Sequence, residues 1–316
     1  MRRLQYFVAV AEEGNVGRAA RRLLMSQPPL SQRIRELEAD LGCVLFVRTP
    51  RGMTLTPPGE VLLAEARRLL EGAERARDLV RRAAGQRVLR VGVLGPGEAA
   101  LSASMAHTFT QQHEGVEVTL VQGDLRDPTL GLNAGNVDAA ITFTPFTRTG
   151  LSTRTVRQER CYAAVPDSSP LAGASVLSRA RLQDQLSIRL ADDTDPLFRA
   201  YWQPGTSPDG PVVRSVDECL HAVLWRKAVA LVPEQVVRGT PVEGITYVPV
   251  SDLPPVELVL AWRRSDRNPL VAHYVDAFCA AVTPSLAHPQ GQGGLRARPA
   301  PPRVQGRSGT PAGGSG

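Results

Sequence analysis

Four polar side chains lie close together in one short segment, and their types are those that recognise DNA bases. They are Gln27, Ser31, Gln32 and Arg33. A glutamine can form two hydrogen bonds with adenine in the major groove, and an arginine can form two with guanine. Each such pair discriminates against the wrong base by about 1–3 kcal/mol. A surface that presents these side chains together could therefore read a DNA sequence.

The segment that carries them is expected to be the second helix of a helix-turn-helix. Ser26 is placed to cap this helix, and the two prolines after Gln27 fit its first turn, where a missing N–H costs little. Gly42 ends the helix, whose buried face is formed by Leu30, Ile34, Leu37 and Leu41. The apolar spacing over residues 16–24 predicts a first short helix, capped by Asn15. The alternative is an ordinary pair of helices with a solvated polar face.

The charge is unevenly distributed along the 316 residues. Residues 1–58 contain nine arginines against five acidic residues, and residues 1–87 contain 16 against ten. Residues 88–283 instead contain 17 basic against 21 acidic residues, and the remainder adds four arginines. A basic first part ahead of an acidic second part favours contact of the first part with phosphates.

Two short strands and a turn are expected directly after the helix-turn-helix. Residues 44–48 and 53–55 have strand character, and residues 49–52 form the turn between them. This two-stranded wing would place Arg51 at its tip. A basic wing tip beside a recognition helix can reach the adjacent minor groove or its phosphates; the alternative is a solvated loop arginine.

A long helix is predicted from Thr56, which caps it, to about Ala84. Its apolar positions step alternately by four and three, which is the pattern of a coiled coil. They are Leu62, Ala66, Leu69, Ala73, Ala76, Val80 and Ala83. A stripe this narrow and rich in alanine favours dimerisation through two closely packed helices, with packing inside one chain as the alternative.

Residues 88–283 alternate between strand and helix patterns, which predicts an α/β domain with a mainly parallel sheet. A first lobe is expected over 88–160 and 256–283, and a second over 161–255. Within them, a helical stretch is expected over 127–132, and the second lobe's strands over 186–190, 211–214 and 228–232. Residues 284–316 are rich in proline, glycine, arginine and glutamine, which predicts a disordered tail.

Many motifs in the first 60 residues resemble those of the LysR-type transcriptional regulators. They are Phe7–Gly14, Arg18–Ala20, Ser26–Ser31, Ile34, Leu37–Glu38, Leu41–Gly42, Leu45–Phe46, Arg48, Leu55–Pro57 and Gly59. The resemblance implies a winged helix-turn-helix over 1–58, a linker helix over 59–87 and a two-lobed effector domain over 88–283, similar to a periplasmic solute-binding protein. It implies contacts with bases and phosphates at Gln27, Pro28, Pro29, Ser31, Gln32 and Arg51. The basic residues Arg18, Arg33 and Arg35 are better placed for phosphates, and Gly17 departs from the family's usual hydroxyl residue.

A ligand site is expected at the carboxyl ends of the strands, where open α/β domains bind their ligands. This points to the segments Leu94–Glu98, Asp124–Leu125 and Thr142–Thr144, and to two residues of the second lobe. The individual residues are Gly95, Pro96, Gly97, Asp124, Leu125, Thr142, Phe143, Thr144, Ala191 and Asp192. Gly95-Pro96-Gly97 could cradle an anion or be a plain tight turn. Trp225 and Arg226 stand where the family usually has a Gly-x-Gly turn, and could narrow the cleft or meet an acidic or aromatic ligand.

The other residue patterns narrow the class of protein. The four cysteines are far apart, which favours a reducing cytoplasm over a disulfide framework, with buried cysteines preferred to a redox pair. No metal site, cofactor or catalytic residue is predicted, and no apolar run approaches the roughly 20 residues of a membrane span. We therefore expect a DNA-binding regulator that forms a homodimer or homotetramer, senses a small-molecule effector and contacts RNA polymerase. An architectural DNA-binding protein without a ligand, and an enzyme that uses the α/β region, are the alternatives.

Overall fold

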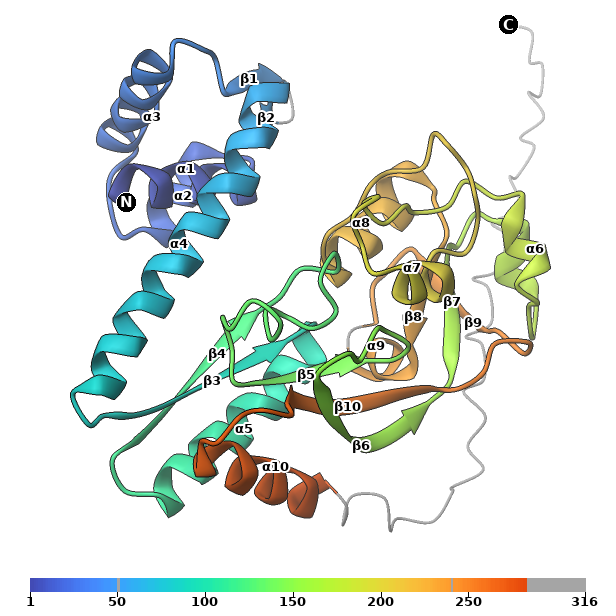
Figure 1. The fold of residues 1–316 in the computed structure, drawn as a ribbon. Coiled ribbons are helices and arrows are strands. Elements are labelled where there is room, and N and C mark those ends of the chain that lie inside the picture. Colours follow the sequence, from blue (N-terminus) through green and yellow to red (C-terminus); the bar gives the residue numbers. More distant parts are fainter. Residues whose placement is uncertain (50–51, 240, 283–316) are drawn as a thin grey trace, which may run out of the picture.

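The structure is a computed structural model that describes residues 1–49, 52–239 and 241–282. A small N-terminal head, one long helix and an α/β body of two lobes follow one another along the chain (Figure 1). The predicted order of helix-turn-helix, wing, long helix and two-lobed body is confirmed. The wing tip at Pro50–Arg51 and the predicted tail lie outside the described residues.

The head consists of three helices and a two-stranded sheet: α1 (Arg2–Glu13), α2 (Val16–Arg22), α3 (Gln27–Leu41), β1 (Phe46–Thr49) and β2 (Gly52–Leu55). Its core is closed by Phe7, whose ring lies 5.3 Å from that of Phe46. The Asn15 side chain caps α2 by accepting from the Arg18 N–H at 3.0 Å. Ser26 occupies the cap position of α3, but its side chain forms no cap hydrogen bond, so that part of the prediction is wrong.

The long helix α4 (Pro57–Ala83) begins as expected, with the Thr56 side chain accepting from the Gly59 N–H at 3.1 Å. A Cβ added to Gly59 would lie 2.3 Å from the Leu45 carbonyl oxygen, so α4 needs a glycine to pack this closely on the wing. Figure 1 shows α4 running from the head to the body.

The first lobe is built on a five-stranded sheet in the order β4-β3-β5-β10-β6. The strands are β3 (Arg87–Val93), β4 (Val116–Gln122), β5 (Ala139–Phe143), β6 (Leu151–Glu159) and β10 (Val256–Arg263), and α5 (Pro96–Gln112) and α10 (Pro269–Val282) pack against each other beside the sheet. The strands β4, β3 and β5 are parallel, but β10 is antiparallel to both of its neighbours. Four of the five strands therefore run in the same direction, as a mainly parallel sheet requires, and only β10 runs the other way, because the chain returns from the second lobe in the opposite direction.

The second lobe has a smaller antiparallel sheet in the order β8-β7-β9. Its elements are β7 (Cys161–Pro166), η1 (Pro170–Gly173), α6 (Ala180–Gln183), α7 (Pro196–Trp202), α8 (Val216–Arg226), β8 (Ala230–Pro233), α9 (Glu234–Gly239) and β9 (Ile245–Pro249). The segments 186–190 and 211–214 form only isolated bridges, Ser187 to Val229 and Arg189 to Val212, so the prediction of full strands there is wrong.

The predicted helix over 127–132 is a series of turns. The Asp127 carboxylate accepts from the Thr129 N–H at 2.9 Å and from the Gly131 N–H at 2.8 Å. These local bonds compete with helix formation, and Leu130 and Gly131 both have positive φ angles.

The strands β6 and β9 were not predicted. The expected loop at Gly95-Pro96-Gly97 is also wrong, because α5 begins at Pro96 with Gly95 as its cap residue.

Candidate functional sites

One face of α3 is exposed to solvent, and it carries most of the residues predicted to contact DNA. Leu30, Ile34 and Leu37 anchor the opposite face in the core of the head. The exposed residues of α3 from the prediction are Gln27, Pro28, Pro29, Gln32, Arg33 and Arg35, and Ser31 is half-buried. The structure therefore gathers these side chains at the N-terminal half of α3, the end that enters the major groove in helix-turn-helix proteins.

The arginines of this surface differ in their partners. Arg33 donates to Glu36 at 2.8 Å, and this hydrogen bond is the main cause that lowers the pKa of the Glu36 carboxyl. Arg18 pairs with Glu13, with 3.5 Å between Nε and Oε2. Arg35 is exposed and has no ion-pair partner among the described residues. In the unbound protein, Arg35 is therefore the most available of the three for a phosphate.

Glu38 connects α3 to the wing. Its Oε1 accepts from the backbone N–H groups of Leu45 and Phe46, at 2.8 and 3.3 Å. The Gly14 carbonyl accepts from the Met53 N–H at 2.8 Å and ties the other wing strand to the end of α1. The predicted contact residue Arg51 lies outside the described residues, but both strands that lead to it are fixed.

Replacing Glu38 with alanine is expected to destabilise the head by about 1–3 kcal/mol, because two partly buried N–H groups lose their acceptor. Chemical unfolding followed by circular dichroism measures this loss. Glu38→Gln retains an acceptor oxygen and is expected to recover part of it. Equal stability of Glu38→Ala and the unsubstituted protein would show that the Glu38 contacts do not hold the wing.

The apolar stripe of α4 divides into two parts. Ala66 is fully buried in the core of the head and Leu62 is partly buried against it. Farther along the helix, Leu69 is 57% exposed, Val80 is 69% exposed, and Ala73 and Ala76 are also exposed. The prediction that Ala66 contacts a second chain is therefore wrong, since its own head covers it. The exposed second half of the stripe is free to contact another molecule.

The C-terminal half of α4 is joined to the first lobe by ion pairs. Asp78 and Arg90 form a pair in which both residues are buried. Arg82 pairs with the buried Asp138, and Arg75 donates to the Asn136 side chain at 2.8 Å. The C-terminal half of α4 is therefore docked on the first lobe.

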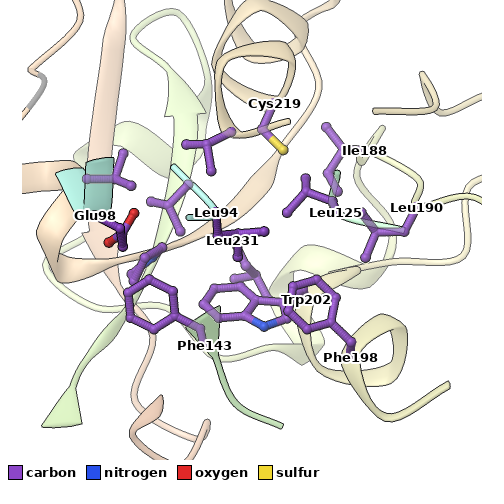
Figure 2. A pocket seen from close by; sticks show the side chains of 14 residues that line it. Leu94, Glu98, Leu125, Phe143, Ile188, Leu190, Phe198, Trp202, Cys219 and Leu231 are labelled. Atoms are coloured by element: carbon purple, nitrogen blue, oxygen red, sulfur yellow. The ribbon is translucent and has the colours of Figure 1, made fainter. Parts of the chain in front are cut away.

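A pocket lies between the two lobes (Figure 2). The volume that the centre of a water-sized sphere can occupy inside it is about 40 Å³. The first lobe contributes Leu94, Glu98, Leu125 and Phe143, and the second contributes Ile188, Leu190, Phe198, Trp202, Val216, Cys219, Leu231, Val232, Pro233 and Val236. Most of these side chains are apolar, and pockets of this kind between lobes are typical ligand sites.

Of the predicted effector residues, Leu125 and Phe143 line this pocket, as do Leu94 and Glu98, the two ends of the predicted segment Leu94–Glu98. Gly95 adjoins it, since an added Cβ there would lie 2.8 Å from Glu98 Oε2 and 3.4 Å from a methyl group of Val216. Pro96 and Gly97 form the first turn of α5.

The other predicted effector residues are not part of the pocket lining. Thr142 precedes Phe143 on β5, where successive side chains point to opposite faces, and Thr144 follows the end of the strand. Asp124 pairs with Arg126 at 2.8 Å. Ala191 is half-exposed, and the Asp192 side chain is 88% exposed. These five residues do not line the pocket, and their contact with an effector stays a prediction.

Most of the pocket wall from the second lobe was missed. Phe198 and Trp202 come from α7, which begins with Asp195 as its cap and Pro196 in its first turn. An Asp-Pro pair is a recognisable helix start, so this signal was present in the sequence. Trp225 lies on α8, stacked on His221 and 71% exposed, and does not narrow the cleft.

In the part of the chain that the structure describes, no group of three or more His, Cys, Asp or Glu side chains is arranged to hold a metal ion. Among the same residues, none of the helices combines the length and apolar character that a bilayer span requires.

Comparisons with known proteins cover both parts of the chain. Residues 1–60 match the family described as "Bacterial regulatory helix-turn-helix protein, lysR family", and residues 82–283 match the "LysR substrate binding domain". The transcriptional regulator TdfR of Cupriavidus pinatubonensis is 33% identical over 295 residues, which are 87% of this chain and 96% of TdfR. The regulator AlsR of Bacillus subtilis is 29% identical over 298 residues, which are 87% of this chain and 94% of AlsR.

A solved structure shows the same architecture. A mutant of full-length BenM is 25% identical, with a TM-score of 0.50 and coverage of 90% of this chain and 96% of BenM. The matched winged helix-turn-helix and the matched substrate-binding domain together span the head and both lobes. The chain belongs to the LysR family of transcriptional regulators, which bind DNA and respond to a small-molecule effector.

Proposed function

We propose that this regulator binds its DNA site as a homodimer or a dimer of dimers, with α3 in the major groove. Gln27 and Gln32 read bases, Pro28 and Pro29 contact thymine methyl groups, and Ser31 supports the same surface. The basic residues Arg18, Arg33, Arg35 and Arg51 hold phosphates. The observation that carries this assignment is the uncovered face of α3, which presents Gln27, Gln32 and Arg35 to solvent. The Gln32 amide donates to Glu36 at 3.4 Å in the unbound protein, and this exposed bond would be exchanged for one to a base.

The proposed roles follow three segments of the chain. Residues 1–58 read DNA, residues 59–87 join two subunits, and residues 88–283 sense the effector. The exposed half of the α4 stripe, from Leu69 to Val80, supports the second role, because it is apolar and uncovered in the single chain. We further propose that the protein acts in the bacterial cytoplasm, has no catalytic activity, needs no cofactor besides its effector and contacts RNA polymerase.

The effector is proposed to bind in the pocket between the lobes. Two hydrogen bonds cross from lobe to lobe at its margins: the Leu125 N–H donates to the Arg214 carbonyl at 2.8 Å, and the Thr147 N–H donates to the Asp195 carboxylate at 3.0 Å. A ligand that prefers the closed arrangement shifts the equilibrium towards it, by as much as its affinities for the two arrangements differ. The ion pairs between the first lobe and α4 would pass this change to the DNA-binding heads.

Replacing Gln27 with alanine is expected to relax base preference, whereas Arg35→Ala should weaken binding to every sequence. The difference arises because base contacts discriminate between sites by about 1–3 kcal/mol, while phosphate contacts do not read sequence. Fluorescence anisotropy on an operator fragment and a scrambled duplex, over a series of salt concentrations, separates the two effects. For Arg35→Ala, the salt slope should fall by about one.

The two variants control for each other, since both lie on the exposed face of α3 and neither is part of the core. Equal loss of specificity in both would contradict the assignment of Gln27 to bases and Arg35 to phosphates. Equal binding of operator and scrambled duplex by the unsubstituted protein would contradict sequence-specific reading by α3.

A further inference from the structure

The pocket between the lobes contains one carboxyl group and no positively charged side chain in its lining. Its walls are leucine, isoleucine, valine, proline and three aromatic side chains. Among these lining residues the ionisable groups are Glu98 and Cys219, and burial raises the pKa of the Cys219 thiol to about 12, so it stays neutral. An anionic ligand would therefore find no cation in the lining to balance its charge, and an uncompensated charge in an apolar site is strongly unfavourable.

Glu98 is almost completely buried, and one of its two carboxyl oxygens lacks a hydrogen-bond donor among the described residues. The residue is 3% exposed, and its Oε1 has no hydrogen-bond partner in the described part of the chain. Figure 2 shows its carboxyl group among the side chains that line the pocket. Burial raises the pKa of this carboxyl group, and the nearby Glu159 acts in the same direction. The opposing charge of Arg157 is largely taken up by Glu159, to which Arg157 donates at 2.5 Å.

The helix N-termini at the pocket do not offer a free anion site. The first turn of α5 carries Glu98 itself. The first turn of α8 carries Asp217 and Glu218, and its cap is complete: the Ser215 hydroxyl accepts from the Glu218 N–H at 3.1 Å, and the Glu218 carboxylate accepts from the Arg214 N–H at 2.7 Å. Each positive helix end is thus already met by an acidic side chain of the same helix.

A second polar atom lies on the aromatic side of the pocket without a partner. The indole Nε1 of Trp202 is buried and donates to no acceptor in the described residues. The Trp202 ring packs against Phe143, with 6.1 Å between the ring centroids, and against Phe198 at 5.9 Å. Buried polar groups of this kind are normally paired, so a ligand or a water molecule is expected to meet both Glu98 and Trp202.

We propose that the pocket selects an apolar, aromatic-sized ligand that carries an amine, whose N–H groups donate to Glu98, and that it rejects the corresponding carboxylate. This inference rests on the proposed effector site between the lobes. An amine supplies the donors that Oε1 lacks, and as an ammonium group it forms a charge-assisted bond with the carboxylate. A carboxylate in the same position could accept from Glu98 only while Glu98 is protonated, and the pair would keep a buried negative charge that no cation in the lining balances.

Three small probes of similar size test this selectivity: benzylamine, benzyl alcohol and benzoate. Their affinities for the full-length protein are measured by isothermal titration calorimetry. Benzylamine is expected to bind at least about tenfold more tightly than benzoate, with benzyl alcohol between them. Glu98→Gln should remove most of the advantage of benzylamine over benzyl alcohol, whereas Glu243→Gln, an exposed glutamate outside the pocket lining, should preserve it.

A fourth variant, Cys219→Trp, fills the pocket and tests whether the probes bind there. Benzoate binding as tightly as benzylamine, with both lost in Cys219→Trp, would overturn the amine preference and leave the effector site in place. Equal binding of benzylamine to Cys219→Trp and the unsubstituted protein would overturn the site itself. An unchanged amine preference in Glu98→Gln, or no binding of any probe, would also overturn the inference. A purely structural role of Glu98 would alter stability without altering the order of the three probes.

Discussion

Replacing Asp78 with alanine is expected to destabilise the protein by about 3–5 kcal/mol, because it leaves the buried Arg90 guanidinium without a counter-charge. Asp78 is 6% exposed and Arg90 is 7% exposed, so water cannot replace the lost partner. Arg90 would keep one bond, from Nε to the Asn136 carbonyl at 2.8 Å, which does not neutralise its charge. Urea unfolding of the full chain, followed by circular dichroism, measures the change in stability.

Two comparison variants isolate the buried charge. Asp78→Asn keeps the shape and one acceptor, so its loss should be smaller. Glu74→Ala removes an acidic residue one turn earlier on α4, where Glu74 pairs with the exposed Arg77 at 2.7 Å. Exposed pairs of this kind contribute at most about 1 kcal/mol. If Asp78→Ala and Glu74→Ala lowered stability equally, α4 would not be docked on the first lobe through Asp78 in solution.

The docking of α4 matters for function because it fixes how the lobes can act on the heads. A helix free of the body would let the two lobes close without any effect on DNA binding. With Asp78, Arg82 and Arg75 all joined to the first lobe, a change between the lobes can move α4. The stability of this junction and the response of DNA binding to the effector should therefore fall together in Asp78→Ala.

The head was predictable because its signals are local. The helix caps, the apolar spacing of α3 and the stop at Gly42 all operate within a few residues of one another, and they set the helix ends that the structure has. The wing could be predicted for the same reason. Glu38 shows the limit of local reasoning, since its role depends on accepting from Leu45 and Phe46 across a turn.

The buried role of Asp78 could not be predicted from the helix pattern. An aspartate next to the apolar stripe of an amphipathic helix is usually solvated, and only the long-range partner Arg90 makes its burial favourable. Ala66 illustrates the same limit, because the heptad pattern is the same whether the stripe meets another chain or the chain's own head. The pattern gives the apolar face but not the partner that covers it.

The pocket was only partly predictable. The rule that ligands bind at the carboxyl ends of strands located Leu94, Glu98, Leu125 and Phe143. Strand alternation turns Thr142 to the face opposite Phe143. Most of the remaining wall comes from α7, α8, β8 and α9, whose approach to the first lobe depends on how the lobes pack. That packing rests on contacts between residues far apart in sequence, such as Leu125 with Arg214.

Leu69→Asp is expected to convert the proposed dimer into monomers. Leu69 is 57% exposed in the single chain and lies in the uncovered half of the α4 stripe. In a two-fold interface, each substituted carboxylate would be buried against apolar side chains of the other helix, without a counter-charge. A cost of at least about 4 kcal/mol follows, which is roughly a thousandfold in the dimer dissociation constant. Sedimentation velocity at micromolar concentration measures the change.

Loss of the dimer should weaken operator binding far more than the substitution could by itself, because Leu69 lies outside the DNA-reading surface. Two linked heads gain about 10²–10⁴ in avidity over one, so anisotropy on a full operator should show a loss of that order, while binding to a half-site stays unchanged. Val61→Asp is the matched control, since Val61 is also on α4 and 67% exposed but lies outside the stripe. If Leu69→Asp remained dimeric, or if Val61→Asp dissociated equally, subunit pairing would have to use a different face of the molecule. The uncovered half of the stripe would then need another partner.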